Sequence, residues 1–63
     1  MRYQYDAETD ILVLKFGKKK PDFGERSGNV ITHYSKNRVP VEIEILDAKR
    51  MVKRIMSIIK KAT

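Results

Sequence analysis

Acidic side chains at alternate positions are the residues of this 63-residue chain that are best suited to chemistry. One set comprises Asp6, Glu8 and Asp10, and oxygen ligands at alternate positions resemble those of a calcium loop. The central glycine and the distant bidentate glutamate of such a loop are absent from this segment. We therefore interpret residues 6–10 as a polar turn with solvated carboxylates, in which an aspartate accepts hydrogen bonds from nearby backbone amides.

A second acidic pair, Glu42 and Glu44, lies in a segment that alternates apolar and other residues, so both side chains share one face of a strand. Paired carboxylates can carry out acid–base catalysis when burial moves their pKa values apart. The same alternation arises in a sheet with one solvated face, where these glutamates could pair with Lys15 or Arg2 on neighbouring strands. We favour this second interpretation.

The remaining candidates for chemistry lack the neighbours that would activate them. His33 is the only histidine, and no candidate nucleophile accompanies it, so we interpret it as a partly buried sheet residue. The three glycines lack the strand-to-helix setting of a phosphate-binding loop. We therefore predict that the chain is not an enzyme, and that it has no catalytic residues, no cofactor-binding residues and no metal ligands. A compact pocket that gathered His33 with Glu42 or Glu44 would instead favour an enzyme.

Short strands must position these side chains. Runs of β-branched and aromatic residues, bounded by turn residues, predict strands at residues 2–5, 11–16, 30–34 and 39–46, with room for a brief fifth strand around residues 23–26. Segment 11–16 is apolar on both faces, which favours a central position in the sheet. Pro40 cannot donate a ladder hydrogen bond, so it must lie at an edge, at a strand start or at a bulge.

The hydrophobic period changes from two to about 3.6 at Asp47, which predicts that a strand continues directly into a helix over residues 47–62. Asp47 is a suitable N-cap because its carboxylate can accept hydrogen bonds from free amides of the first turn. One apolar stripe of the helix follows spacings of three and four, and we call it the helix stripe. We predict that it forms a partner or dimer interface, and its residues are Met51, Val52, Ile55, Ile58 and Ile59.

The predicted fold is α+β, an antiparallel meander of four or five strands with the C-terminal helix packed across one face. All 63 residues form a single domain, with the sheet at about residues 2–46 and the helix at about residues 47–62. The residues expected in the core are Tyr5, Leu12, Leu14, Val30, Val41, Ile43, Ile45, Met51, Ile55 and Ile58.

The length of the chain limits its core. In so short a chain, the free energy of apolar burial about equals the conformational entropy lost on folding. There is no cysteine, so disulfides and thiolate metal clusters are excluded as sources of stability. Association is the remaining common source, so we predict a homodimer or an obligate partner.

No apolar run has the length of a signal peptide or a membrane span, which predicts a soluble cytoplasmic protein without a membrane role. Charged residues make up 35% of the chain, a composition that resembles that of thermophile proteins.

Basic residues dominate the end of the chain. The net charge is +6, and the segment from Ala48 onward contains six basic residues and no acidic one. A basic helix side of this kind is most often a solvated surface that keeps the protein soluble. It also attracts phosphates, although no aromatic side chain is interleaved with the charges to stack on bases. The predicted nucleic-acid contacts are Lys18, Lys19, Lys20, Arg50, Lys53, Arg54 and Lys61.

Two motifs make the chain resemble a known family. The first is Tyr5-Asp6-Ala7-Glu8-Thr9-Asp10, which opens into the apolar strand, and the second is Ile43-Glu44-Ile45-Leu46-Asp47-Ala48. With Val30-Ile31 and Tyr34 between them, they resemble the family catalogued as domain of unknown function 2283. His33 and Glu42 depart from the family pattern, in which an acidic residue and a glycine are usual. The resemblance covers nearly the whole chain before the last helix, and it implies a small antiparallel sheet with a helix and no established enzymatic activity.

The marginal core, the helix stripe and this resemblance together predict a non-enzymatic protein-interaction module that forms homodimers. Some members of the family are found beside toxin-like genes, so the resemblance further implies an antitoxin-like role with a small toxin-like protein partner. The alternative is nucleic-acid binding through the basic C-terminal helix and the Lys18–Lys20 loop, and such binding would weaken steeply as the salt concentration rises.

Overall fold

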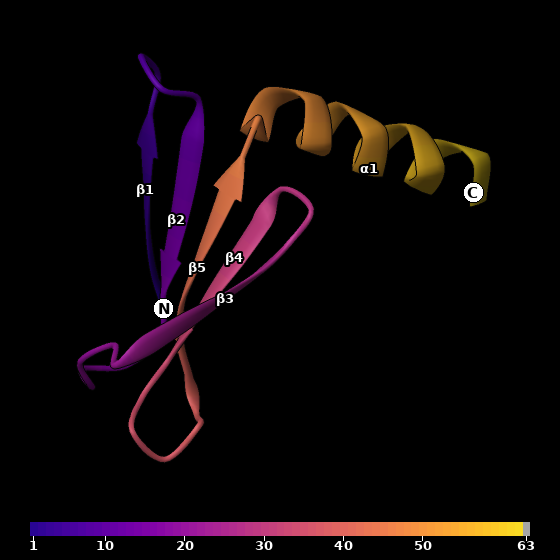
Figure 1. Cartoon of the computed structure of the whole chain (residues 1–63). Coiled ribbons are helices and arrows are strands. Elements are labelled where there is room, and N and C mark those ends of the chain that lie inside the picture. The colour runs from indigo at the N-terminus through magenta and orange to yellow at the C-terminus, as the bar shows by residue number, and fades with distance from the viewer. Residues whose placement is uncertain (63) are drawn as a thin grey trace.

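A hairpin on each side of one long strand builds the sheet of this protein. The computed structural model describes residues 1–62 as five strands followed by one helix (Figure 1). The strands are β1 (Arg2–Asp6), β2 (Ile11–Lys15), β3 (Phe23–Ser27), β4 (Val30–Tyr34) and β5 (Pro40–Leu46), and the helix is α1 (Ala48–Ala62). All neighbouring strands are antiparallel. The α+β class, with an antiparallel sheet and a C-terminal helix, is therefore confirmed.

The order of the strands differs from the predicted meander. It is β1-β2-β5-β4-β3, so β5 inserts between the two hairpins and pairs with both β2 and β4. The distribution of apolar residues explains this order. The most apolar strand, β2, and the longest strand, β5, both lie inside the sheet, where they gain most from burial. The polar strand β3 lies at one outer edge, where charged side chains are tolerated and discourage pairing with other chains.

Pro40 lies at a position that its missing amide proton permits. It is the first residue of β5, and the register between β4 and β5 shifts between His33 and Tyr34, next to the Tyr34–Pro40 pair. The prediction of a strand start or a bulge at this proline is therefore confirmed.

The register sorts the strand side chains onto two faces of the sheet. Residues directly opposite each other on neighbouring strands share a face, and the side chains alternate along each strand. We call one side the apolar face; it carries Tyr3, Tyr5, Leu12, Leu14, Val30, Ile43 and Ile45. The opposite side, which we call the polar face, carries His33, Glu42 and Glu44 together with Ile11, Val13 and Ile31.

The helix does not pack across the sheet, and this corrects the predicted arrangement. α1 leaves the end of β5 and runs away from the sheet (Figure 1). Ala48 is its only buried residue within the part of the chain that the structure describes, and Met51 is half-buried, whereas Ile55 and Ile58 remain 50% and 59% exposed. The link between β5 and α1 is the single residue Asp47, which is too short for the helix to fold back over the sheet.

The core is correspondingly small. Among the described residues, the buried apolar side chains are Val41 and Ala48, and no large side chain is fully buried. The strand residues expected in the core on the apolar face are half-buried, except Tyr5, which is 40% exposed. The predicted core was therefore wrong for Tyr5 and for the two helix isoleucines, because no other element of residues 1–62 covers the apolar face. Within the described chain, no helix is both long enough and apolar enough to span a membrane.

Candidate functional site

The turn between β1 and β2 holds the start of the helix through Asp10. The backbone carbonyl of Asp10 accepts a hydrogen bond from the Ala48 amide at 3.0 Å, and its Oδ1 accepts one from the Lys49 amide at 3.1 Å. The Tyr5 hydroxyl donates to the same Oδ1 at 2.7 Å. Asp10 therefore caps α1 from a segment that is distant in sequence, and this contact fixes the direction in which the helix leaves the sheet.

Hydrogen bonding shifts the pKa values of both side chains in this contact. The hydrogen bond from Tyr5 lowers the pKa of Asp10 below its ordinary value, and the bond from the Lys49 amide adds to that effect. The same contact raises the pKa of the Tyr5 hydroxyl, mainly because its proton is held by the carboxylate. The ionised aspartate and the protonated tyrosine are therefore the forms that stabilise the helix start.

Asp47 does not serve as the cap that the sequence predicted. Its carboxylate lies 3.1 Å from Arg50 Nη2, and its backbone is in the left-handed region with φ of 57°. The acidic turn behaves as predicted at Asp6, whose Oδ1 accepts the Glu8 amide at 3.0 Å. Asp10 has a different role from the one predicted for it, because it bonds to the helix rather than to its own turn.

A continuous apolar surface runs from the sheet to the helix. Between the apolar face and the first turns of α1 lies a groove of about 610 Å³, lined by Tyr5, Leu12, Ala48, Lys49, Arg50, Val52 and Lys53. Beyond the groove, the helix stripe remains exposed: Ile55, Ile58 and Ile59 are between 48% and 59% exposed. The residues predicted to form an interface thus lie together on one surface, with Met51 half-buried at its inner end.

The predicted nucleic-acid contacts fall into two separate groups. Lys15 pairs with Glu42 near the start of β5, so the Lys18–Lys20 loop that follows β2 lies at that end of the strand. The helix follows the other end of β5, and its basic residues Arg50, Lys53, Arg54 and Lys61 are exposed. The seven residues of β5 therefore separate the two basic groups.

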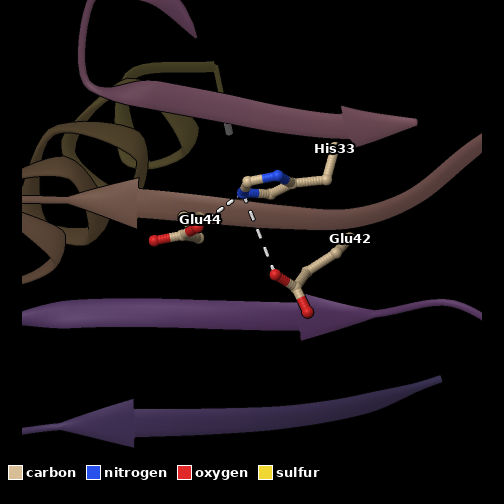
Figure 2. A network of polar contacts seen from close by, with 3 residues as sticks. All are labelled: His33, Glu42 and Glu44. Atoms are coloured by element: carbon tan, nitrogen blue, oxygen red, sulfur yellow. Dashed lines mark hydrogen bonds and ion pairs between the residues drawn. The ribbon is translucent and has the colours of Figure 1, made fainter. Parts of the chain in front are cut away.

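His33, Glu42 and Glu44 meet on the polar face (Figure 2). His33 lies opposite Glu42 in the register of β4 and β5, and Glu44 is two residues further along β5. The Nε2 atom of His33 is 2.5 Å from Oε1 of Glu44 and 3.9 Å from Oε2 of Glu42. The side chains are 25%, 21% and 28% exposed for His33, Glu42 and Glu44 respectively. The shared face of the two glutamates was predicted, but their contact with the histidine was not.

A glycine on the neighbouring strand gives the imidazole its space. Gly24 lies opposite His33 in the register of β3 and β4. A Cβ atom at this position would lie 3.1 Å from Nδ1 and 3.3 Å from Cε1 of the His33 ring, which is tighter than almost all real contacts. The ring is therefore placed with one nitrogen beside Gly24 and the other toward the two carboxylates.

Comparison with known proteins identifies one related group. The model of the family described as "Protein of unknown function (DUF2283)" matches residues 2–49. No curated protein and no solved structure matches the chain significantly. The matched segment contains all five strands and the contact between Asp10 and the helix start, and it ends before the helix stripe.

Proposed function

The chain belongs to the DUF2283 family, and we propose that it is a non-enzymatic interaction module whose working form is a homodimer. The observation that carries this proposal is the absence of a covered core: among the described residues, the buried apolar side chains are Val41 and Ala48. A folded domain normally buries one hydrophobic face of its sheet against another element. In a dimer, the second copy supplies that element.

The size of the uncovered surface fits an obligate dimer. The exposed area of the single chain, 5385 Å², exceeds by about 1,200 Å² the roughly 4,200 Å² expected for a compact protein of this mass. Its radius of gyration, 13.2 Å, likewise exceeds the roughly 11 Å expected for this length. If both copies bury this excess, the interface totals about 2,400 Å², within the range of obligate homodimers.

A second copy matches the uncovered surface better than an unrelated partner does. Each chain has an apolar sheet face without a helix over it and an apolar helix stripe without a sheet under it. In a two-fold symmetric pair, the helix of each copy can lie along the groove and apolar face of the other. This contact covers the helix stripe and the apolar face of both copies at once. The tether at Asp10 holds the start of a helix that runs away from its own sheet, which leaves the helix stripe accessible to a second chain.

Light scattering after size-exclusion chromatography tests the proposal directly. We expect a mass close to twice the 7.4 kDa of one chain at both low and high salt. Because each chain carries a net charge of +6, the copies repel each other, and added salt should tighten the dimer by screening that repulsion. A stable, salt-independent monomer with a cooperative melting transition would overturn the proposal.

Protein or nucleic-acid partners would bind at the surfaces that the dimer leaves free. The family resemblance implies a toxin-like protein partner, and the basic side of α1 favours nucleic acid as the second candidate. Exposed Arg54 and Lys61 support that candidate, since they lie outside the groove and no acidic residue follows Asp47. A nucleic-acid binder should shift duplex DNA or RNA in a gel at low salt and lose affinity steeply as salt rises. No shift at low salt would remove this candidate and leave the dimer proposal intact.

A further inference from the structure

We propose that His33, Glu42 and Glu44 bind one divalent transition-metal ion, for which Zn²⁺ is the test case. The three side chains offer one imidazole nitrogen and two carboxylate oxygens, and these ligand atoms all lie within 4.8 Å of one another. Imidazole and carboxylate are established ligands of Zn²⁺, which often takes three protein ligands and completes its tetrahedron with water.

The distances agree with a shared ion. Ligand atoms bound to one tetrahedral Zn²⁺ at its usual bond lengths are about 3–3.5 Å apart. The two distances from His33 Nε2, 2.5 Å to Glu44 and 3.9 Å to Glu42, lie on either side of that range. Rotations of the glutamate side chains that lengthen the shorter distance and shorten the longer one would place all three atoms, which already lie within 4.8 Å of one another, around one ion.

The fold holds these ligands in place. Glu42 and Glu44 lie on β5, the central strand of the sheet, and His33 lies on its neighbour β4 (Figure 2). Gly24 leaves room for the imidazole on the other side, so Nε2 is aimed at the two carboxylates. Ligands on paired strands keep their spacing better than ligands on a loop, and such preorganisation favours metal affinity.

The charges on this face favour a cation. Two half-buried carboxylates lie two residues apart on one face, and both of them approach the imidazole of His33. The basic groups on the adjoining strands of this face are Lys15 and Arg26, and both are exposed, so they can turn into solvent when an ion binds. A divalent ion would balance both carboxylates and leave the imidazole neutral. Because the polar face is opposite the apolar face, this site is independent of the proposed dimer.

Zinc titration of the untagged full chain tests the site. His33 is the only histidine, so its imidazole ¹⁵N resonances report on the site without ambiguity. We expect these resonances to shift on addition of ZnCl₂, with saturation at one ion per chain by calorimetry. Loss of a residue that only supports a metal ligand typically weakens metal binding by about 10- to 100-fold. Loss of a direct ligand should weaken it at least as much, so we expect His33→Gln and Glu44→Gln each to reduce the Zn²⁺ affinity by that factor or more.

Glu25→Gln is the matched control, because Glu25 lies on the opposite face of the sheet and is 58% exposed. This variant should bind Zn²⁺ with native affinity, and each variant's melting curve reports whether it is folded. MgCl₂ should shift the histidine resonances far less, because Mg²⁺ prefers octahedral oxygen ligands. The proposal is overturned if Zn²⁺ leaves the imidazole resonances unchanged, or if a folded Glu44→Gln protein binds it as tightly as the native chain.

If Glu44→Gln fails to fold, Glu42→Gln gives the same comparison at the more distant ligand. Gly24→Val provides a second measurement, because its side chain would occupy the space of the imidazole while leaving all three ligands present. We expect this variant to weaken Zn²⁺ binding at least tenfold, as displacement of an outer-shell support does. Native affinity in a folded Gly24→Val protein would show that the ring position in this structure is not the one that binds metal, and would overturn the proposal.

Discussion

Ile55→Glu is expected to break the dimer and, with it, the cooperative fold. Ile55 lies at the centre of the helix stripe and is 50% exposed in a single chain. A carboxylate at this position in the proposed interface would be buried without a partner, at a cost of about 3–5 kcal/mol per copy. On a solvent-exposed helix the same substitution would change stability by no more than about 0.5 kcal/mol. Light scattering and far-ultraviolet circular dichroism across a concentration series distinguish the two results.

Neither helix propensity nor net charge can account for a loss of association in Ile55→Glu. Glutamate is at least as good a helix former as isoleucine, so the helix itself is not weakened. The change also lowers the net charge of a basic protein, which reduces repulsion between copies. Dissociation of this variant would therefore report burial of the new charge in the interface.

Ser57→Glu is the matched control for Ile55→Glu. It places the same residue two positions later, on an exposed side of α1 that is outside both the helix stripe and the groove, and it changes the net charge by the same amount. We expect the native mass and a native melting curve for this variant. If Ile55→Glu also keeps the native mass and melting temperature, the helix stripe is not the interface, and the proposed homodimer does not form through it.

Local patterns in the sequence predicted most of the strands and the helix. The alternation at Val41, Ile43 and Ile45 gives β5 its period of two, and the change of period after Asp47 marks the start of α1. These signals depend only on near neighbours along the chain. The fifth strand, β3, has a weaker signal because Gly24, Glu25 and Arg26 interrupt its apolar pattern, as expected for an edge strand.

The position of the helix could not be predicted in the same way. An amphipathic helix must bury its apolar stripe, but the pattern does not specify which chain provides the covering surface. The direction of the helix is set where β5 meets α1. At this point Asp10 accepts hydrogen bonds from two helix amides, although it lies almost forty residues upstream of the helix start. The motif residues Tyr5, Asp10 and Ala48 were visible in the sequence, but their mutual contact depends on the pairing of β1, β2 and β5.

The cluster on the polar face was missed for a related reason. The spacing of Glu42 and Glu44 shows that they share a face, but it does not show what lies opposite them. His33 meets them only because β4 pairs with β5 in a register that places it across from Glu42. A shift of one residue in that register would move the histidine to the other face of the sheet. The histidine and the glutamates could therefore be connected only after the register was known.

Asp10→Ala is expected to release the start of the helix. The substitution removes the Oδ1 acceptor of the Tyr5 hydroxyl and of the Lys49 amide, and it places alanine at a backbone φ of 56°, which favours glycine, asparagine and aspartate. We expect the melting temperature to fall by about 5 °C or more, from the loss of a helix cap and the added backbone strain. Dimerisation should weaken as well, because the helix would no longer be directed toward the second chain.

Asp10→Asn separates the hydrogen bonds from the charge. Asparagine keeps an oxygen acceptor and tolerates the left-handed backbone, so the variant should be more stable than Asp10→Ala at neutral pH. Because the folded protein lowers the pKa of Asp10, its carboxylate stabilises the fold at pH values above the unfolded pKa, near 4. This contribution is lost as the pH falls through the lower pKa of the folded state. The native protein should therefore lose stability on acidification below about pH 4. Asp10→Asn should lack that contribution at every pH.

Tyr5→Phe tests the cause of the shift. Without the hydroxyl donor, the pKa of Asp10 should rise toward its unfolded value. Asp10 should then contribute less to the loss of stability at low pH than it does in the native protein. The measurement is the melting temperature between pH 2 and pH 7 of the native chain, the two Asp10 variants and Tyr5→Phe. The differences between these curves give the contributions of the Asp10 charge and of its hydrogen bond from Tyr5. If Asp10→Ala melts like the native chain at neutral pH, the tether does not direct the helix, and the outward position of α1 must be held by the single-residue link at Asp47 or by the second copy.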